Sequence, residues 1–477
     1  MNESKKRGKR SMAVAVSVLL FTWIVLLAVL LAIYILRLYG YNTFSEWKNR
    51  NLVLEVVRPE VITPQPTKTE VRPEIQTPSQ NVELQESLTP MPALPPVKTM
   101  IFSGDELVDS ELRLKAEELF GLDEEVCYAS YENGVFFSVV FQKEDWVIPF
   151  VYNRNTGKVV NGSDLIKETY FAVIKERLQT YVAENFPEEA EDEFVSYKQV
   201  YQADDYQKIY LTEDQLVFYF EANTLTDNHP AFSYSADLSE AEAFFKINLD
   251  GSENGPYIRE LDPDKKMIAI TFDDGPYPKV EKQILELFEK YNGRATFFFL
   301  GQRIEEWYPD TPAMIYEAGH EVASHTYSHT VNFALDSEDK IWSEVNRANL
   351  VIAKATGYAP DYIRYPGGTF GKTALQVPMI KVNWNLNSVD YAVKNDSNGA
   401  KSIYKKLTNP EKLGDGCIVL LHSIYQNSYD GVELFVEYLV EQGYELVTLS
   451  ELFYYKGPEL KREEAYRDGF GTPAKSN

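Results

Sequence analysis

Length, charge and cysteine content exclude several classes of protein. The chain has 477 residues, 44% of them hydrophobic, and a formal net charge of −25 at pH 7. It is therefore long enough for more than one domain with a buried core. The acidic balance argues against a nucleic-acid partner. With only two cysteines, Cys127 and Cys417, a disulfide framework is excluded and an isolated bridge is not expected.

The first elements along the chain predict a membrane anchor. Residues 1–11 are basic, and residues 12–36 carry no charged side chain. A helix of that length reaches roughly 37 Å, enough to cross a hydrocarbon core of about 30 Å. The positive-inside rule then places residues 1–11 in the cytoplasm and the later domains outside the cell membrane. A cleaved signal peptide is the alternative, but its apolar region is shorter, about 7–15 residues.

A linker and a mixed domain are expected next. Residues 37–99 read as a juxtamembrane and linker segment, because Pro59 to Pro96 holds nine prolines in 38 residues and favours extended chain. Residues 100–255 combine helical spacing with strand-like runs and predict an α+β domain. Helical spacing appears at 111–122 and 168–186, and apolar runs at 135–141, 147–153 and 215–223. Through 210–225 and 241–251 this segment resembles the DUF3298-type domain, which implies no chemistry.

Residues 263–455 alternate short apolar runs with helical patterns, before a polar tail at 456–477. Fully apolar strands that alternate with helices indicate a parallel sheet in an α/β fold. We expect an irregular (β/α) barrel, with its chemistry at the carboxyl ends of the strands. The expected strands are 267–272, 295–301, 417–423 and 445–449, and the expected helices carry apolar faces at Val280–Tyr291, Ile341–Ile352 and Val432–Leu439.

Polar residues follow the apolar runs, which is typical of a site and not of a core. His325 and His329 are four residues apart and would share one face of a helical turn. Two histidines with one carboxylate leave a position open for water, as in a catalytic zinc site, and Asp274 is the expected carboxylate. His320-Glu321 and His325 have the spacing HExxxH, so they do not form the HExxH protease motif. We expect His320 to be structural.

Five short motifs carry a family resemblance. They are TFDDGP (271–276), SHTYSH (324–329), RYPGG (364–368), the stretch 384–391 and LLH (420–422). In this order they resemble the polysaccharide deacetylase family, which is carbohydrate esterase family 4 or the NodB homology domain. With the predicted anchor and middle domain, the chain resembles membrane-anchored peptidoglycan N-acetylglucosamine deacetylases. No protein partner is evident.

The resemblance implies a role for each residue of the motifs. One divalent metal, zinc by first expectation with cobalt or manganese as alternatives, would be held by Asp274, His325 and His329 and would activate water. The implied catalytic groups are Asp273 as base, Arg364 as its partner, Gly367 as oxyanion donor, His422 as acid and Asp390 as the partner of His422. Near the barrel rim, Tyr365, Trp384 and Tyr391 are the candidate aromatic contacts for sugar rings, with packing as the alternative for each.

Departures from the family pattern leave alternatives open. Ser324 replaces the usual Asn, while Asn387 and Tyr391 replace the Asp and Trp of the fourth motif. These changes affect the expected substrate preference and pH optimum more than the reaction type. The alternatives are an O-acetyl esterase or a deacetylase of another extracellular polysaccharide, and a non-catalytic glycan-binding or sensing module. Retention of Asp273 and His422 argues against the last of these.

Overall fold

The structure is a computed structural model that describes residues 127–143, 146–185, 208–221 and 231–476. The predicted cytoplasmic segment 1–11, anchor 12–36, linker 37–99 and helix 111–122 lie outside the described residues. Among the residues that are described, no helix is both long enough and apolar enough to cross a bilayer. The anchor therefore stays a prediction from the sequence.

The described part of segment 100–255 contains two antiparallel sheets and helices. Strands β1 (Cys127–Asn133), β2 (Phe136–Lys143), β3 (Trp146–Asn153) and β4 (Lys158–Val160) pair in that order. Strands β5 (Ile209–Leu211), β6 (Gln215–Phe220) and β7 (Phe232–Asp237) form the second sheet. The helices are α4 (Gly162–Leu165), α5 (Glu168–Asn185) and α7 (Leu238–Ala241), followed by the turn η1 (Glu242–Phe244). This arrangement has the predicted α+β character.

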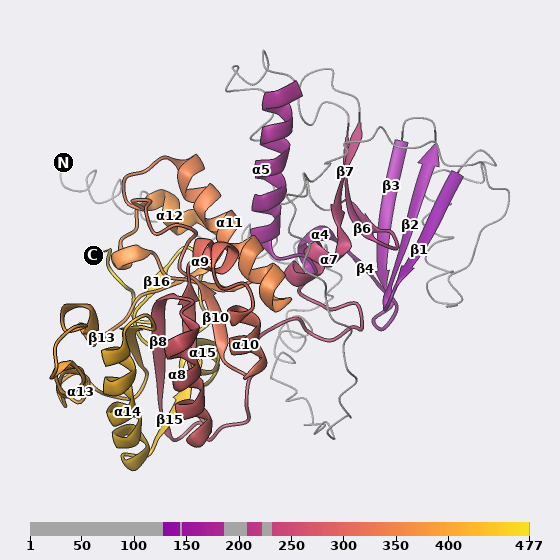
Figure 1. The fold of residues 1–477 in the computed structure, drawn as a ribbon. Coiled ribbons are helices and arrows are strands. Elements are labelled where there is room, and N and C mark those ends of the chain that lie inside the picture. Colours follow the sequence, from indigo (N-terminus) through magenta and orange to yellow (C-terminus); the bar gives the residue numbers. More distant parts are fainter. Residues whose placement is uncertain (1–126, 144–145, 186–207, 222–230, 477) are drawn as a thin grey trace, which may run out of the picture. The chain divides into compact units, whose positions relative to one another are not determined.

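The second part of the chain is built on one curled parallel sheet (Figure 1). Its strands are β8 (Lys266–Gly275), β9 (Thr296–Phe299), β10 (Glu321–Ser324), β11 (Tyr362–Ile363), β12 (Ile380–Val382), β13 (Leu386–Asn387), β14 (Cys417–His422), β15 (Tyr444–Val447) and β16 (Ala465–Tyr466). The order is β13-β14-β8-β9-β10-β11-β12-β16, and β15 pairs with the start of β8. The predicted α/β class with a parallel sheet is confirmed, and the barrel is open between β13 and β16.

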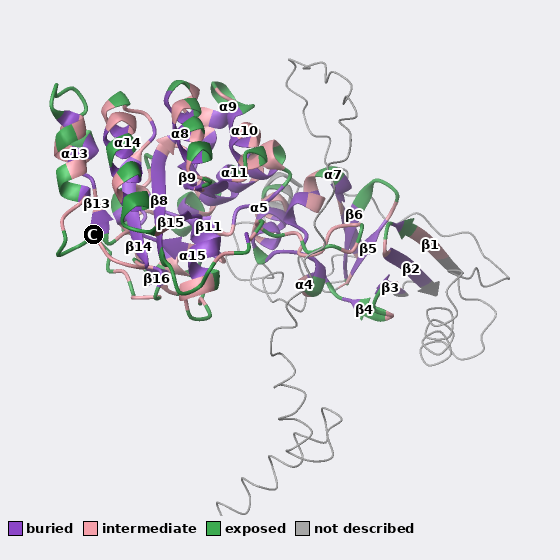
Figure 2. Ribbon diagram, turned by 90° about the horizontal axis from the view of Figure 1, so that it is seen from below, coloured by how far each residue is buried: buried purple, intermediate pink, exposed green. Residues whose placement is uncertain are grey.

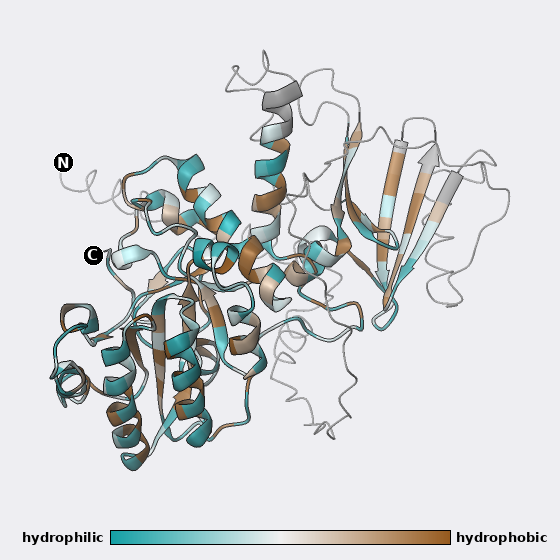
Figure 3. Cartoon of the chain, in the orientation of Figure 1, coloured by the Kyte–Doolittle hydropathy of each residue, from teal (hydrophilic) through white to brown (hydrophobic). Residues whose placement is uncertain are grey.

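Helices cover the outside of this sheet because one face of each is apolar. They are α8 (Pro278–Lys290), α9 (Gly301–Glu306), α10 (Thr311–Glu317), α11 (Glu338–Thr356), α12 (Lys372–Gln376), α13 (Gly399–Leu407) and α14 (Gln426–Glu441), whereas α15 (Leu449–Lys456) packs on the inner side through Leu449, Leu452 and Phe453. In α8 the buried residues Val280, Ile284 and Leu287 recur at helical spacing. Gly357 caps the carboxyl end of helix α11, and its φ of 73° is the left-handed conformation that glycine adopts most easily. Buried strands and half-exposed helices are visible in Figure 2, and the matching apolar and polar colours in Figure 3.

Strand β8 divides its side chains between two cores. Ile268, Ile270 and Phe272 belong to the cluster that packs against the covering helices. Met267 and Ala269 belong to a second cluster, with residues of β9, β10 and β14, inside the barrel. Alternate residues of a strand point to opposite faces. The inward-facing series that begins with Met267 and Ala269 therefore continues to Thr271 and Asp273, where the polar residues of the site begin.

The last residues of the chain and His320 were each given a role from the sequence, and the fold places both. Residues 456–477 were expected to be a polar tail, but Ala465–Tyr466 forms β16, which pairs in parallel with β12. That boundary was wrong, because a two-residue strand leaves no periodic signal. His320 is structural as expected: its Nδ1 accepts a hydrogen bond of 3.0 Å from the N–H of Ala295, and Glu321 begins strand β10.

Candidate active site

The residues singled out in the sequence meet at the carboxyl ends of the parallel strands. Strands that run in the same direction open on the same rim, where α/β proteins commonly place their chemistry. Each polar residue lies at or just after the end of a strand. They are Asp273 and Asp274 in β8, His325 and His329 after β10, Arg364 after β11, Asp390 after β13, and His422 at the end of β14.

A local irregularity in β8 lets two consecutive aspartates serve one site. Regular strand geometry would turn Asp273 and Asp274 to opposite faces. The register between β8 and β9 shifts between Phe272 and Gly275, as at a β-bulge. Asp274 has a φ of 67°, in the left-handed region that is uncommon for residues other than glycine. This bend brings both carboxylates to the rim.

Asp274, His325 and His329 form a compact group that fits a metal ion. Their ligand atoms all lie within 4.8 Å of one another. Asp274 Oδ1 is 3.4 Å from His325 Nε2 and 3.5 Å from His329 Nε2. This oxygen is buried and has no hydrogen-bond partner within the described part of the chain. A buried, unpaired carboxylate oxygen that faces two imidazoles is costly unless a cation lies between them, so the donor set suits a divalent metal.

The tautomer of His325 supports the same assignment. Its Nδ1 lies 2.7 Å from the carbonyl oxygen of Arg364. A carbonyl oxygen can only accept, so Nδ1 carries the proton and Nε2 presents its lone pair to Asp274 and His329. Second-sphere hydrogen bonds of this kind commonly fix metal-binding histidines.

Electrostatics keep Asp274 ionised. Burial disfavours its charged form, but the neighbouring His325, His422 and His329 outweigh this effect and hold its pKa well below the usual range. The pKa of His329 is lowered, chiefly by burial. A carboxylate that stays charged beside a histidine that resists protonation is a ready donor set for a cation.

The two histidines do not share a helical turn, which corrects the sequence interpretation. Residues 325–330 form a loop without helix, and Thr326 and His329 have φ values of 70° and 65°. An α-helix requires negative φ throughout. The bent loop nonetheless brings the rings of His325 and His329 to a centroid distance of 5.3 Å.

Glu344 holds this loop in place and was not foreseen. Its Oε2 accepts hydrogen bonds from the N–H groups of Tyr327 (3.1 Å) and Ser328 (2.8 Å). Its Oε1 accepts one from the hydroxyl of Ser328 at 2.6 Å. Glu344 lies in α11, on the turn next to the buried residue Val345. No sequence signal distinguishes it from the other acidic residues of that helix.

A buried ion pair fixes Asp273. Arg364 is fully buried and its Nη1 donates to Asp273 Oδ1 at 2.7 Å. The same nitrogen donates to Thr271 Oγ1 at 2.7 Å, so two successive inward-facing residues of β8 bind one guanidinium. Asp273 Oδ2 is left on the side of the histidines, 3.9 Å from His325 Nε2. Asp273 is therefore held in a fixed orientation beside the metal-binding group.

His422 is oriented by Asp390 on the other side of the group. Asp390 is fully buried, and its Oδ1 lies 2.8 Å from His422 Nδ1. Its Oδ2 accepts from the N–H of His422 at 2.7 Å and from Ser428 Oγ at 2.6 Å. Burial disfavours the imidazolium, but Asp390 outweighs it, with Asp273 and Asp274 adding to the effect, and raises the pKa of His422 to about 9. His422 Nε2 faces Asp274 Oδ2 at 3.9 Å.

The predicted sugar-contacting aromatics separate into different environments. Tyr365 is 1% exposed, stacks on Phe333 and donates its hydroxyl to the carbonyl of Ala374. It is a core residue, so its prediction as a substrate contact was wrong. Tyr391 is 50% exposed and meets the ring of His422 edge-on at 6.0 Å. Trp384 is half-buried and lines an open cavity.

Gly367 lies in the turn η2 (Pro366–Gly368), directly after the Arg364-Tyr365 pair. Its φ of 64° lies in the left-handed region. Only glycine adopts this conformation without a steric penalty, which explains the residue type at this position. Its implied role as an oxyanion donor stays a prediction.

Known proteins are similar to the part of the chain that carries Asp273, the two histidines and Arg364. The family model described as polysaccharide deacetylase matches residues 260–378. A Bacillus cereus protein named peptidoglycan-N-acetylglucosamine deacetylase is 33% identical over 206 residues, which cover 41% of this chain and 92% of that relative. The chain belongs to the polysaccharide deacetylase family.

Longer members of the polysaccharide deacetylase family are also similar. The Bacillus subtilis peptidoglycan-N-acetylmuramic acid deacetylase PdaC is 36% identical over 198 residues, which are 41% of each chain. The Listeria monocytogenes peptidoglycan-N-acetylglucosamine deacetylase PgdA is 30% identical over 232 residues, 48% of this chain and 47% of that relative. The matches thus span less than half of these relatives. A solved structure of PdaC is 36% identical, covers 41% of this chain and 93% of that one, and has a TM-score of 0.38.

Proposed function

We propose that the chain is a metal-dependent hydrolase that removes N-acetyl groups from N-acetylglucosamine residues of peptidoglycan. One observation carries the proposal. A metal-fitting group is flanked on one side by the Asp273–Arg364 pair and on the other by the His422–Asp390 pair. Hydrolysis of an amide needs a base for the water and an acid for the amine, and these two pairs supply both.

The residues divide the reaction between them. A divalent metal held by Asp274, His325 and His329, zinc by first choice, would polarise the acetyl carbonyl and lower the pKa of water. Asp273 accepts the proton of the attacking water, and Arg364 keeps its carboxylate in place. His422, protonated and oriented by Asp390, donates a proton to the departing amine, which leaves poorly as an anion. The N–H of Gly367 stabilises the developing oxyanion, a contribution of about 3–4 kcal/mol for one such donor.

N-Acetylmuramic acid is a second candidate for the sugar. The B. subtilis relative PdaC, at 36% identity, is named for that substrate. The two sugars differ by a lactyl ether, so the same acetamide chemistry applies to both. Product analysis decides between them, because each deacetylated sugar has its own mass after digestion of the glycan.

The test is acetate release from purified peptidoglycan by the full chain. Release should stop after chelation and return with zinc, cobalt or manganese. Asp273→Asn should bind metal as the wild type does, yet release little acetate. Turnover that survives chelation would contradict the metal-dependent mechanism. Turnover of ester substrates alone would favour an O-acetyl esterase, and glycan binding without turnover would favour a binding module.

We also propose that residues 12–36 anchor the chain in the cell membrane, with the hydrolase domain outside. The proposal is supported by the charge-free run and the basic residues before it. Protease added to intact cells should remove the domain, and a chain without residues 1–40 should leave the membrane fraction. Full protection from protease would contradict this topology.

A further inference from the structure

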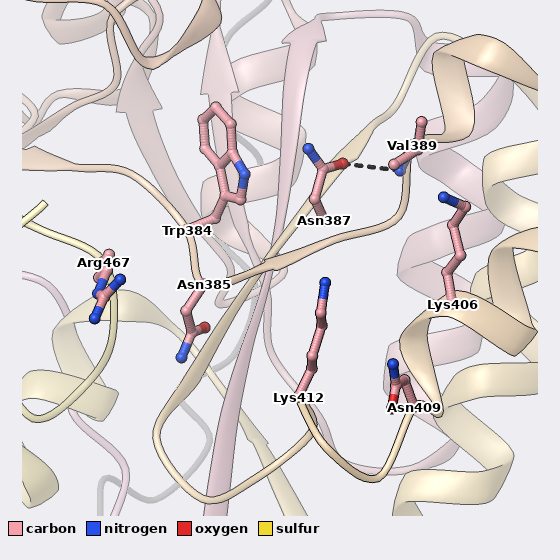
Figure 4. Close-up of a pocket in the computed structure, with 8 residues that line it drawn as sticks. All are labelled: Trp384, Asn385, Asn387, Val389, Lys406, Asn409, Lys412 and Arg467. Carbon is pink, nitrogen blue, oxygen red and sulfur yellow. Dashed lines mark hydrogen bonds between the residues drawn. The ribbon is translucent and has the colours of Figure 1, made fainter. Parts of the chain in front are cut away.

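A cavity of about 420 Å³ lies beside the opening of the barrel (Figure 4). The two ends of the sheet approach each other here: Arg467 follows β16, and Trp384 and Asn385 lead into β13. Helix α13 and the loop after it close the other side. The lining residues are Trp384, Asn385, Asn387, Val389, Lys406, Asn409, Lys412 and Arg467.

The charge of this cavity is opposite to that of the chain. Three of its lining residues are cationic and none is acidic, whereas the whole chain carries −25. Figure 4 shows Lys406, Lys412 and Arg467 approaching the space from different sides. Within the described residues, none of these three side chains forms an ion pair, although many lysines and arginines elsewhere do. The positive charge is therefore available to a ligand.

Two of the three asparagines of the cavity also offer donors. The side-chain oxygen of Asn385 accepts from the N–H of Ile418, that of Asn387 from Val389, and that of Asn409 from Glu411. A backbone N–H can only donate, so the contacting atom of each amide is oxygen. The Nδ2 groups of Asn387 and Asn409 are thus left as donors, whereas the side chain of Asn385 also bonds to Cys417. A site that combines cations with N–H donors is complementary to an oxyanion.

The cavity adjoins the acid side of the candidate active site. Asn387 and Val389 line it, and the next residue, Asp390, binds both the ring and the backbone of His422. Asn387 also pairs with Leu420, two residues before His422. A glycan with one sugar at His422 would therefore bring its neighbouring substituents to the cavity. The half-buried indole of Trp384 adds an apolar wall of the kind that packs on sugar rings.

We propose that this cavity is a subsite for an oxyanion, a carboxylate or a phosphate, carried by the glycan substrate. The proposal rests on the proposed function. In peptidoglycan the carboxylates belong to muramic acid and its peptide stem, and phosphates enter with attached polymers. A neutral N-acetylglucosamine oligomer has neither. The subsite would favour glycans that carry such a group over neutral ones.

The test compares acetate release from three substrates at low salt. These are neutral N-acetylglucosamine oligomers, peptidoglycan fragments with free carboxylates, and fragments that also carry phosphate. The double variant Lys406→Gln/Lys412→Gln should raise KM for the anionic fragments about tenfold or more, since it removes two charge-assisted contacts. Its kcat should be unchanged, and so should both constants for the neutral oligomer. A larger increase in KM for the phosphate-bearing fragments than for those with carboxylates alone identifies phosphate as the bound group, and equal increases identify carboxylate.

Lys405→Gln is the matched control. Lys405 is exposed on the same helix α13 but does not line the cavity, so its loss should change no KM. An unchanged KM of the double variant for both anionic fragments would overturn the proposal. So would an equal change for anionic and neutral substrates, or the same change in Lys405→Gln.

A binding measurement separates this proposal from the proposed function. Calorimetry with the same fragments should show weaker binding of the anionic ones to the double variant, whether or not the wild type turns them over. If the wild type releases no acetate from any substrate but this difference in binding is found, the hydrolase proposal fails and the subsite stands. Equal binding by wild type and variant refutes the subsite even when acetate is released.

Discussion

Replacing Arg364 with methionine removes a buried charge while leaving most of the side-chain volume in place. The guanidinium has no exposed surface, and its Cζ lies 4.1 Å from the centroid of the Phe298 ring. It donates to Asp273 and Thr271, and to the carbonyl oxygens of Val382 (2.9 Å) and Asn383 (3.0 Å). The variant loses all of these bonds and leaves the carboxylate of Asp273 buried without a countercharge.

The expected loss of stability is large for this reason. Removing one partner of a buried ion pair costs about 3–5 kcal/mol. A domain of this size loses about 2–4 °C in Tm for each kcal/mol, so Tm should fall by about 6–20 °C. Arg347, which is exposed and pairs with Glu305 at 2.9 Å, is the matched control. Arg347→Met should cost at most about 1 kcal/mol, because surface pairs contribute little.

Thermal unfolding in the presence of a chelator measures the difference in Tm between Arg364→Met and Arg347→Met. The chelator prevents metal binding from adding to the stability of either variant. The double variant Arg364→Met/Asp273→Asn should be more stable than Arg364→Met alone, because the unpaired charge is gone. The reasoning would be refuted if Arg364→Met were no less stable than Arg347→Met. It would also be refuted if the two site substitutions had simply additive effects.

Three further predictions concern the surroundings of the site. Glu344→Gln should weaken zinc binding about tenfold or more, because the loop of the two histidines loses its charged acceptor; a competition titration with a chelating dye checks this, and unchanged affinity contradicts it. Asp390→Asn should move the alkaline limb of the pH–rate profile to lower pH, because the carboxylate of Asp390 raises the pKa of His422 to about 9 and His422 must be protonated to act as the acid. An alkaline limb at the same pH in the variant would show that Asp390 does not act by raising the pKa of His422. Glu281 is buried, which raises its pKa to about 7, so the folded state holds its proton more tightly and loses stability as pH rises from about 4.5 through 7. When the pH is raised from 5 to 8, the Tm of Glu281→Gln should fall by less than the Tm of the wild type. Equal decreases in Tm would exclude this carboxyl as a source of the pH dependence.

The parallel sheet was predictable because its strands are short, wholly apolar runs between helical patterns. The apolar runs at 267–272 and 417–423 predict β8 and β14, which are buried on both faces. Order along the chain also predicted which polar residues follow the strands. Parallel strands deliver such residues to one rim, so topology brings Asp273, His325 and His422 close together, whereas Asp274 also depends on the irregularity in β8.

Local backbone geometry was not predictable in the same way. The spacing of His325 and His329 predicts a helical turn, but Thr326 and His329 have positive φ values, and the N–H groups of the loop bond to Glu344 of helix α11. Tyr365 is an aromatic residue near the barrel rim, where both sugar stacking and packing are expected from the sequence. Its partner Phe333 is 32 residues earlier in the chain, and no periodicity links the two. Such contacts arise only when the elements pack.

Pairing of β16 with β12 gives the last described residues a protective role. Lys381 lies opposite Ala465 and Val382 opposite Tyr466, and the carbonyl of Tyr466 also accepts from the N–H of Asn383. A chain shortened before Ala465 would present β12 as a bare edge, with unpaired N–H and C=O groups ready to recruit a strand from another molecule. Intermolecular pairing and aggregation would then threaten the shortened protein before any loss at the catalytic rim became apparent.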